Sequence, residues 1–484
     1  MPVPVLSLRQ RLALAAYGLA TTLLTPLVLL RLVLRSRVEP LYRHALARRL
    51  ALGPRPQAAG PGTPRLWLHA VSLGETRAAI PLLNALRQQH PGLQLLLTHS
   101  TATGWEAGRA ILQPGDHQTW LPWDSPGATR RFIRTWQPTL GVMMETELWP
   151  LLVRRATQGG VPIVIANARL SERSLRRGQR FAALLQPAAS CLAGALAQSA
   201  DDAARLARMG VSSVPVCGNL KFDLAPPAAR LAQGRAWRAQ HGRPVLLAAA
   251  TREGEEAELL AVWRQAFAAH KLAQVESTAL GDSAAQGESA WPTLLLVPRH
   301  PQRFDEVARL IEASGARLLR RSALDDSLQA AEPAEQTATA ASSGPTVLLG
   351  DSLGEMPMYY AMADLALLGG SFQPLGGQNL IESLACHCPI VLGPSTFNFA
   401  QAANWALQHG LARRSTGLEA AVTLVLAALA AWNTAPTAPQ QLPWPRPSSR
   451  DFDVALAEHR GAAQRQALAL APWLPQSAAR RTPG

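Results

Sequence analysis

A carboxylate at the start of a helix is the first residue of this sequence whose type and position could do chemistry. Glu75 follows an alternating apolar run, Arg65–Ala70, and a glycine-containing turn at 72–74, a pattern typical of a strand, a tight turn and a new helix. In an open α/β sheet such a junction lies at the carboxyl end of a strand, where ligands bind. The helix amides favour the ionised form, so Glu75 could act as a base. Taken alone, the spacing favours a simpler role as a dipole-complementing acid.

Other charged side chains follow later apolar runs of the first half. Glu145 and Glu147 come directly after Thr139–Met144, and Lys221 follows Val214–Cys217. Strands and helices alternate throughout, which predicts an α/β fold with a parallel, doubly wound sheet in this half. The carboxyl ends of parallel strands meet at one edge, so we expect these charges at the edge that holds Glu75.

The second half restarts the alternation and carries turns that suit an anionic group. Four of them follow apolar runs: Arg299-His300, Leu353-Gly354-Glu355, Gly369-Gly370-Ser371 and Asn379-Leu380-Ile381-Glu382. Glycine pairs let backbone amides approach phosphate closely, and arginine adds a cation with fork geometry. None of these turns completes a Walker loop or a dinucleotide fingerprint. Together they favour nucleotide binding.

The cysteines and paired acids give weak metal motifs. The chain has four cysteines, too few for a disulfide framework, which favours a reducing compartment. Cys386-His387-Cys388 lies within an apolar passage and has no second ligand pair, so buried thiols are the better interpretation. The acids Asp201 and Asp202 open a helical pattern, which favours helix capping over metal binding.

The charge is strongly basic. There are 47 Lys and Arg against 33 Asp and Glu, a net charge of +14. Such a balance favours a phosphate-bearing or anionic-membrane partner, although an arginine-rich genome would also produce it. The apolar fraction of 48% excludes wholesale disorder.

The N-terminus predicts a membrane anchor. Leu12–Leu30 contains 19 residues without a charge, just enough at about 1.5 Å per residue to cross about 30 Å of hydrocarbon. More arginines follow the segment than precede it, which keeps the downstream chain cytoplasmic. A cleaved signal peptide is the main alternative, and the arginines after the segment argue against it. Gly18 and Pro26 leave open a helix that lies in the membrane plane.

The composition divides the remainder of the chain. We expect an anchor at 1–37, a linker at 38–64, Rossmann-like domains at 65–235 and 236–434, and a Pro-rich segment followed by a helix at 435–484. Two polar tracts, 270–290 and 323–344, are predicted to be surface insertions. The C-terminal helix could pack back across the junction between the domains.

These motifs, in this order, resemble the Kdo transferases, which add 3-deoxy-D-manno-octulosonic acid (Kdo) to lipid A precursors in Gram-negative bacteria. The resemblance covers nearly the whole chain through eight blocks: HAVSLGET, METELWP, NARLSERS, GNLKFD, VPRHPQRF, GDSLGEM, GGQNLIE and GPSTFNF. It implies the GT-B architecture, two Rossmann-like domains facing a cleft, with the acceptor domain first and the donor domain second. It also implies a bacterial inner-membrane location, with the catalytic domains on the cytoplasmic side.

The resemblance implies a role for each matching residue. Glu75 matches the base that deprotonates the acceptor, and Glu145 and Lys221 match residues assigned to transition-state stabilisation. Residues in three segments match those that hold the CMP of the donor, CMP-Kdo: Arg299, His300, Leu353, Gly354, Glu355, Asn379, Leu380, Ile381 and Glu382. The family needs no metal or other cofactor for transfer. The sequence departs from the pattern at Gln378, where relatives often have histidine.

The expected function is therefore transfer of Kdo from CMP-Kdo to a lipid A precursor of the tetraacyl disaccharide phosphate type, in lipopolysaccharide biosynthesis. Its expected partners are these two substrates and an anionic membrane surface. One rival is a membrane-associated GT-B transferase or epimerase that uses a UDP-sugar. The other is a basic, membrane-tethered binding protein for nucleic acid, which no recognised module in the sequence supports.

Overall fold

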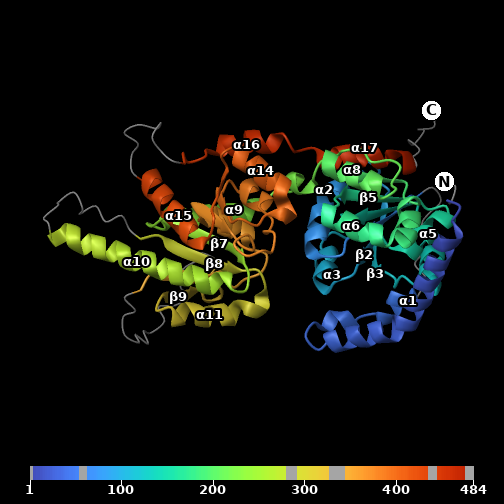
Figure 1. The fold of residues 1–484 in the computed structure, drawn as a ribbon, viewed down its shortest axis with the longest axis horizontal. Helices are drawn as coiled ribbons and strands as arrows, with labels where there is room; N and C mark the ends of the chain where they lie inside the picture. Colours follow the sequence, from blue (N-terminus) through green and yellow to red (C-terminus); the bar gives the residue numbers. More distant parts are fainter. Residues whose placement is uncertain (1–3, 54–62, 280–290, 326–343, 434–443, 475–484) are drawn as a thin grey trace. The chain divides into compact units, whose positions relative to one another are not determined.

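The chain folds into two compact units. A computed structural model describes residues 4–53, 63–279, 291–325, 344–433 and 444–474. Unit 1 comprises Met1–Leu224 and His459–Gly484, and unit 2 comprises Ala225–Glu458. The red C-terminal helix in Figure 1 accordingly lies among the blue and green elements of unit 1.

Unit 1 is built on a six-stranded parallel sheet with the order β3-β2-β1-β4-β5-β6. Its strands are β1 Arg65–His69, β2 Gln94–His99, β3 His117–Trp120, β4 Leu140–Met144, β5 Ile163–Ala168 and β6 Gly194–Ala197. The strand order reverses between β1 and β4, where His69 pairs with Met143. Ligands bind outside the carboxyl ends of the strands at such a reversal. Glu75 and Glu145 follow these two strands.

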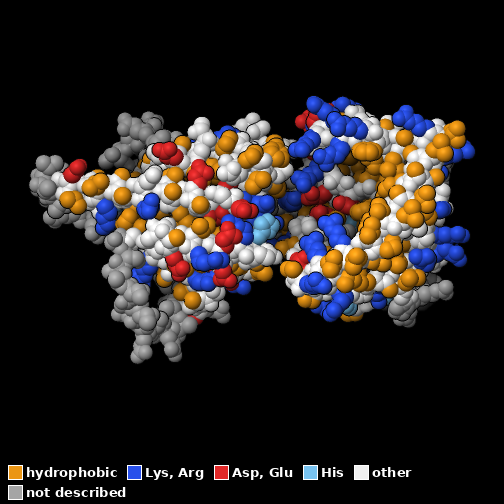
Figure 2. All heavy atoms as spheres, turned by 60° about the horizontal axis from the view of Figure 1, so that its bottom comes forward, with side chains coloured by type: hydrophobic (Ala, Val, Ile, Leu, Met, Phe, Trp, Pro, Cys, Tyr) orange, Lys and Arg blue, Asp and Glu red, His pale blue; other side chains and the backbone are white. Residues whose placement is uncertain are grey.

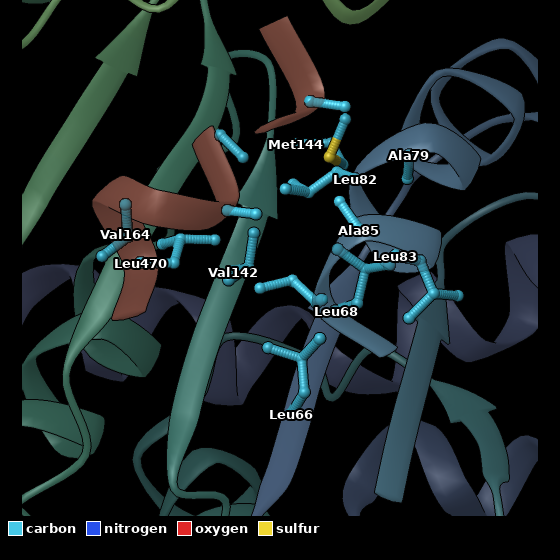
Figure 3. Close-up of a cluster of buried hydrophobic side chains, with 14 of the residues drawn as sticks. Leu66, Leu68, Ala79, Leu82, Leu83, Ala85, Val142, Met144, Val164 and Leu470 are labelled. Carbon is cyan, nitrogen blue, oxygen red and sulfur yellow. The ribbon is translucent and has the colours of Figure 1, made fainter. Parts of the chain in front are cut away.

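Helices cover both faces of this sheet. They are α2 Leu73–Gln89, α3 Ala102–Arg109, α4 Pro126–Trp136, α5 Pro150–Gln158, α6 Glu172–Arg180, α7 Ala182–Ala189, α8 Ala200–Arg208 and α17 Ala462–Leu470. Side chains alternate between the faces, so Leu68 and Val142 pack with α2 and with Leu470 of α17 (Figure 3). Trp67 and Met143 point the other way, into a cluster formed with α4 and α5.

The N-terminal segment is folded onto unit 1. Helix α1 spans Leu8–Arg35 and is followed by short 3₁₀ helices at Pro40–Arg43 and Leu46–Leu50. Residues 38–53 of the expected linker, 38–64, therefore include two short 3₁₀ helices and belong to unit 1. Tyr42 is buried, and Trp120 donates its indole N–H to the carbonyl of His44 at 2.7 Å. Residues 54–62 lie outside the described part of the chain.

Unit 2 carries a seven-stranded parallel sheet with the order β13-β12-β11-β7-β8-β10-β9. Its strands are β7 Val245–Thr251, β8 Thr293–Pro298, β9 Arg317–Arg320, β10 Thr346–Leu349, β11 Leu365–Leu368, β12 Ile390–Leu392 and β13 Ala412–Arg414. The order reverses between β7 and β11, the kind of position where open α/β sheets bind their ligands. The structure thus confirms the expected α/β class with two Rossmann-like sheets.

The helices of unit 2 are α9 Ala228–Gln240, α10 Glu255–Ala279, α11 Phe304–Ala313, α12 Met356–Met362, α13 Ile381–Ala385, α14 Ala400–Gln408, α15 Leu418–Asn433 and α16 Ser449–Ala457. The core on one sheet face is formed with α10, α11 and α15. Unit 1 ends at Leu224 and not at 235, because α9 packs on α12. At that contact Gly234 lies against the backbone of Met358, where a side chain would not fit.

Several local expectations differ from the structure. Residues 270–279 continue helix α10, so the polar tract 270–290 is not an insertion from its start. Residues 280–290 and 326–343, which form most of the two expected insertions, lie outside the described residues. Val214–Cys217 forms only a single bridge, from Val216 to Ala197. The expected C-terminal helix is two helices, α16 and α17, separated at Gly461, which has a φ of 84°.

Candidate active site

Glu75 lies at the end of β1, in the first turn of α2. Ser72 caps this helix, and its hydroxyl accepts a hydrogen bond from the backbone N–H of Glu75 at 3.4 Å. The Glu75 carboxylate turns back onto the strand end and accepts from the N–H of Val71 at 2.8 Å and from the Ser72 hydroxyl at 3.4 Å. The side chain is thereby held in one place at the sheet edge.

The Glu75 carboxyl is tuned toward neutral pH. Burial raises its pKa to about 7, and the negative charges of Glu145 and Glu147 add to that rise, while the Val71 and Ser72 hydrogen bonds oppose it. A carboxylate with a pKa near the working pH is well suited to take up a proton in a reaction.

Glu145 lies at the end of the neighbouring strand β4 and is tightly paired. Its backbone has a φ of 61° and donates to the carbonyl of Ala166 at 2.9 Å. The Lys221 ammonium lies 2.8 Å from one carboxylate oxygen and the Arg169 guanidinium 3.0 Å from the other. Burial alone would raise the pKa of Glu145, but these two cations outweigh it and lower the pKa. Glu145 therefore stays ionised beside Glu75.

The corresponding edge of unit 2 is cationic. Arg299 follows β8 and donates from Nε to the side-chain oxygen of Gln378 at 3.2 Å. The pKa of His300 is lowered by burial and by the nearby charges of Arg252, Arg299 and Arg303. The charges of Arg252 after β7, of Arg299 after β8 and of Arg303 in the following 3₁₀ helix therefore favour the neutral form of this imidazole.

A buried acid fixes the glycine turn after β11. The carboxylate of Glu255 accepts from the N–H groups of Arg252 and Gly370 at 2.8 Å each and from that of Phe372 at 3.2 Å. Gly370 has a φ of 68°, a conformation that side chains rarely adopt. Glu255 thus ties the end of β7 to the glycine turn and satisfies the Gly370 amide internally.

The turn after β10 is anchored by Glu355. This acid is buried and accepts from Arg321 at 3.1 Å, pairs with Arg230 at 3.0 Å, and accepts from the Ser352 hydroxyl at 2.5 Å. Its carboxylate is therefore used within the protein. Gly354, with a φ of 79°, and the 75%-exposed Leu353 form the outer part of this turn.

The segment before α13 is also mostly internal. Leu380 and Ile381 are buried, and the side-chain oxygen of Asn379 accepts from the N–H of Ile381 at 3.3 Å. Only the half-exposed Asn379 and Glu382 could present side chains to a ligand here. Of the expected donor-site residues, Arg299 and His300 both lie at the end of β8. The side chains of Glu355, Leu380 and Ile381 are buried, so these residues could serve a ligand mainly by shaping the backbone.

Comparisons with known proteins give the family. The family model described as 3-deoxy-D-manno-octulosonic-acid transferase matches residues 44–224. A 3-deoxy-D-manno-octulosonic acid transferase from Bordetella pertussis is 42% identical over 95% of this chain and 99% of its own length. The enzyme of that name from Haemophilus influenzae is 35% identical over 78% of this chain and 81% of its own. The chain belongs to the Kdo transferase family.

The fold agrees with that assignment. A glycosyltransferase structure from Rickettsia africae superimposes with a TM-score of 0.52 at 11% identity, covering 85% of this chain and 98% of the other. At this identity the likeness concerns the fold alone, and it supports the GT-B class expected from the sequence. This Kdo transferase is therefore a glycosyltransferase with two Rossmann-like units.

Two arginines of this Kdo transferase were not among the expected site residues. Arg169 pairs with Glu145, and Arg252 lies with Arg299 around His300. Arg169 follows β5 and Arg252 follows β7 directly. Position at the end of an apolar strand was thus the signal that could have found both.

The cysteines behave as the sequence predicts. Cys386 and Cys388 are both buried, and His387 between them meets the carboxylate of Asp453 at 3.2 Å. Burial raises the pKa of both thiols, which keeps them protonated. Within the described ranges, no three His, Cys, Asp or Glu side chains come together as a metal site.

Proposed function

We propose that the protein transfers Kdo from CMP-Kdo to a lipid A precursor of the tetraacyl disaccharide phosphate type, at the membrane surface, in inner-core lipopolysaccharide synthesis. The observation that carries the proposal is the half-buried Glu75 carboxyl, with a pKa of about 7, beside the ion-paired Glu145. In a Kdo transferase, this pair of strand ends supplies a proton acceptor and a fixed charge arrangement in one place.

Glu75 is the proposed general base. The acceptor hydroxyl oxygen forms a bond to the anomeric carbon of Kdo while its proton moves to the Glu75 carboxylate. The bond from that carbon to the CMP phosphate breaks, and CMP leaves with the electron pair. General-base assistance of this kind contributes about 10²–10⁴ in rate.

Glu145 and Lys221 are the proposed stabilisers of developing charge. The anomeric carbon becomes positive as CMP departs, and the acceptor oxygen gains partial negative charge as its proton moves to Glu75, until the new bond to the anomeric carbon takes up that charge. Because Lys221 and Arg169 already hold Glu145 in place, this charge arrangement needs little reorganisation during the reaction.

The proposed CMP-binding residues are Arg299, His300, Leu353, Gly354, Glu355, Asn379, Leu380, Ile381 and Glu382. Arg299 would act directly, since its fork geometry suits a phosphate. Glu355 would act indirectly, by holding the turn that carries Leu353 and Gly354 through its pairs with Arg321 and Arg230.

The proposed location is the cytoplasmic face of the inner membrane, with α1 as the anchor. By length and composition α1 could cross a membrane. Its middle, however, is docked on unit 1: Tyr17 donates to the carboxylate of Asp124 at 2.9 Å, and the Trp123 indole donates to the carbonyl of Thr21 at 2.7 Å. A spanning helix would place residues 17–21 in the hydrocarbon, away from these partners. These contacts favour a helix lying along the membrane surface.

The remaining surface of α1 suits that arrangement. Its exposed leucines are Leu8, Leu12, Leu19, Leu23, Leu24, Leu27, Leu30 and Leu34. Figure 2 shows hydrophobic side chains among Lys and Arg side chains on the part of the surface formed by unit 1. Val5→Cys tests the orientation: we expect no labelling by an impermeant maleimide in intact spheroplasts. Labelling there would place the N-terminus outside and contradict the in-plane helix.

The function is tested with purified protein, CMP-Kdo and a tetraacyl lipid A precursor. We expect CMP release and a lipid product heavier by one or more Kdo residues in the mass spectrum. UDP-sugars replace CMP-Kdo in a parallel reaction. Product formed only from a UDP-sugar, or no product from either donor, would contradict the proposal.

A further inference from the structure

The helix α17, near the end of the chain, contacts the two segments that carry Arg169 and Lys221, the cations paired with Glu145. Gln466 is fully buried on this helix. Its side-chain oxygen accepts from the N–H of Asn167 at 2.9 Å, and its side-chain N–H donates to the carbonyl of Gly218 at 3.1 Å. Asn167 stands two residues before Arg169, and Gly218 stands three residues before Lys221. One amide therefore bridges the backbones leading to both cations.

Other contacts hold the same loop to α17. Arg465 donates from Nε to the carbonyl of Cys217 at 3.0 Å. The carboxylate of Asp223 accepts from the N–H groups of Gly461 and Ala463 at 2.6 Å each, which caps the start of the helix. Lys221 is thus bracketed by two attachments to α17, at 217–218 and at 223.

The two cation-bearing segments are also joined directly. The side-chain oxygen of Asn167, a residue with a φ of 51°, accepts from the N–H of Leu220 at 3.0 Å. Gly218 has a φ of 86°, so its carbonyl is presented by a backbone that few other residues adopt. A side chain that both donates and accepts at this depth is required to satisfy both backbones, and an amide provides that.

The body of α17 is fixed by the core. Ala467 and Leu470 are fully buried, and Figure 3 shows Leu470 beside Val142 and Val164 of the central strands. Gln466 therefore lies on a helix that packs against β4 and β5, the strands that lead to Glu145 and Arg169.

We infer that Gln466 is a positioning residue of the transferase: it sets the spacing between the Arg169 and Lys221 segments so that both cations meet Glu145. The inference rests on the proposed role of Lys221 and goes beyond it, because it assigns part of the site to a helix outside the eight sequence blocks and outside the family-model match at residues 44–224. Its effect passes through Lys221 and Arg169, without contact between Gln466 and substrate.

A double-mutant cycle tests this inference. Gln466→Met keeps the size of the side chain and removes both hydrogen bonds. We expect its single-turnover rate to fall about 10–100-fold, because a misplacement of about 1 Å at a site costs up to about 10² in rate. We expect CMP affinity to be unchanged. In a Lys221→Met background, the same substitution should cost less than about 3-fold, since its main target is already gone.

The control is Gln464→Met, on the same helix but exposed, where we expect the wild-type rate. If Gln466→Met does not fold, Asp223→Asn replaces it in the cycle, because this change weakens the second attachment of the Lys221 loop to α17 and leaves the buried Gln466 amide in place. Full multiplication of the Gln466 and Lys221 effects, or a wild-type rate in Gln466→Met, would overturn the positioning role. A wild-type rate in Lys221→Met would instead overturn the proposed function of Lys221 itself.

Discussion

Each of the two sheets has one point where its strand order reverses, and the side chains at these two edges differ in their electrostatics. In unit 1, Glu145 is neutralised by two cations, while Glu75 makes only neutral hydrogen bonds to Val71 and Ser72. In unit 2, Glu255 accepts from backbone amides and Glu355 is paired with two arginines. The charges of Arg252, Arg299 and Arg303 act on His300 at that edge, and Arg303 is also paired with Glu256.

This difference assigns separate tasks to the two units. An acid with a neutral-range pKa suits proton uptake, whereas clustered guanidinium groups suit a phosphate. Both units have a parallel sheet with a reversal in strand order, and their difference lies in the side chains at the strand ends. Substitutions in unit 1 should therefore change the rate of transfer, and substitutions in unit 2 should change donor binding.

The largest effect is expected at Glu75. Glu75→Gln keeps the size and removes the base, so single-turnover transfer should fall about 10²–10⁴-fold. CMP affinity, measured by calorimetry, should remain at the wild-type value because the change lies in unit 1. Glu106→Gln, an exposed acid on α3, is the matched control. A large loss of CMP affinity in Glu75→Gln would contradict the assignment of donor binding to unit 2 alone.

The next effect is expected at Lys221. Lys221→Met leaves Glu145 with Arg169 alone, so the Glu145 pKa should rise and transfer should fall about 10²–10³-fold, as for loss of one fixed electrostatic group. Breaking a buried ion pair costs about 3–5 kcal/mol of stability, and the surviving Arg169 pair should keep the loss below that range. Single-turnover kinetics measure the change in transfer rate, and urea denaturation measures the change in the free energy of unfolding. As a control, Lys271→Met, at an exposed lysine on α10, should leave both the rate and the stability unchanged. An unaltered rate in Lys221→Met would contradict the proposed role of Lys221 beside Glu145.

A smaller effect of a different kind is expected at Arg299. Arg299→Ala should raise the donor KM about 10–100-fold, the range for loss of one charged hydrogen bond, and change kcat little. Arg299→Lys should restore only part of the affinity, because lysine lacks the fork. Arg264→Ala, an exposed arginine on α10, serves as the control. A fall in kcat with an unchanged donor KM would place Arg299 outside the donor site.

The smallest effect is expected at Glu147. Its negative charge raises the pKa of Glu75, so Glu147→Gln should make Glu75 easier to ionise and lower that pKa. The base then becomes active at lower pH, and the acid limb of the pH–rate profile should move to lower pH. The Glu106→Gln profile should overlay the wild type. If the acid limb of the Glu147→Gln profile moves to higher pH, the assignment that Glu147 raises the pKa of Glu75 is wrong.

The sequence predicted the strands that are marked by a clear run of apolar residues. The apolar runs Arg65–Ala70 and Thr139–Met144, each followed by a turn, located β1 and β4 within a residue or two, because such buried strands have a clear pattern. It did not predict β3 or β9, whose sequences, HQTW and RLLR, are polar or half-exposed. Edge strands of this kind lack the apolar run on which that inference depends.

The placement of the candidate residues at the sheet edge was predictable, but the contacts between them were not. Glu75, Glu145 and Lys221 follow apolar runs, so their positions at the sheet edge could be inferred. The long-range contacts could not, since Gln466 lies 299 positions from Asn167 in a helix with an ordinary alanine-rich sequence. The burial of Leu380 and Ile381 likewise depends on tertiary packing that the local motif does not encode.

The pH dependence of single-turnover transfer tests the central claim, that Glu75 is the base, most directly. With both substrates bound, the wild-type rate should fall on the acid side with a midpoint near pH 7, following the pKa of about 7 at Glu75. The residual rate of Glu75→Gln should lack this limb. A midpoint near about 4.3, the ordinary glutamate value, or a limb that persists in Glu75→Gln, would contradict the assignment.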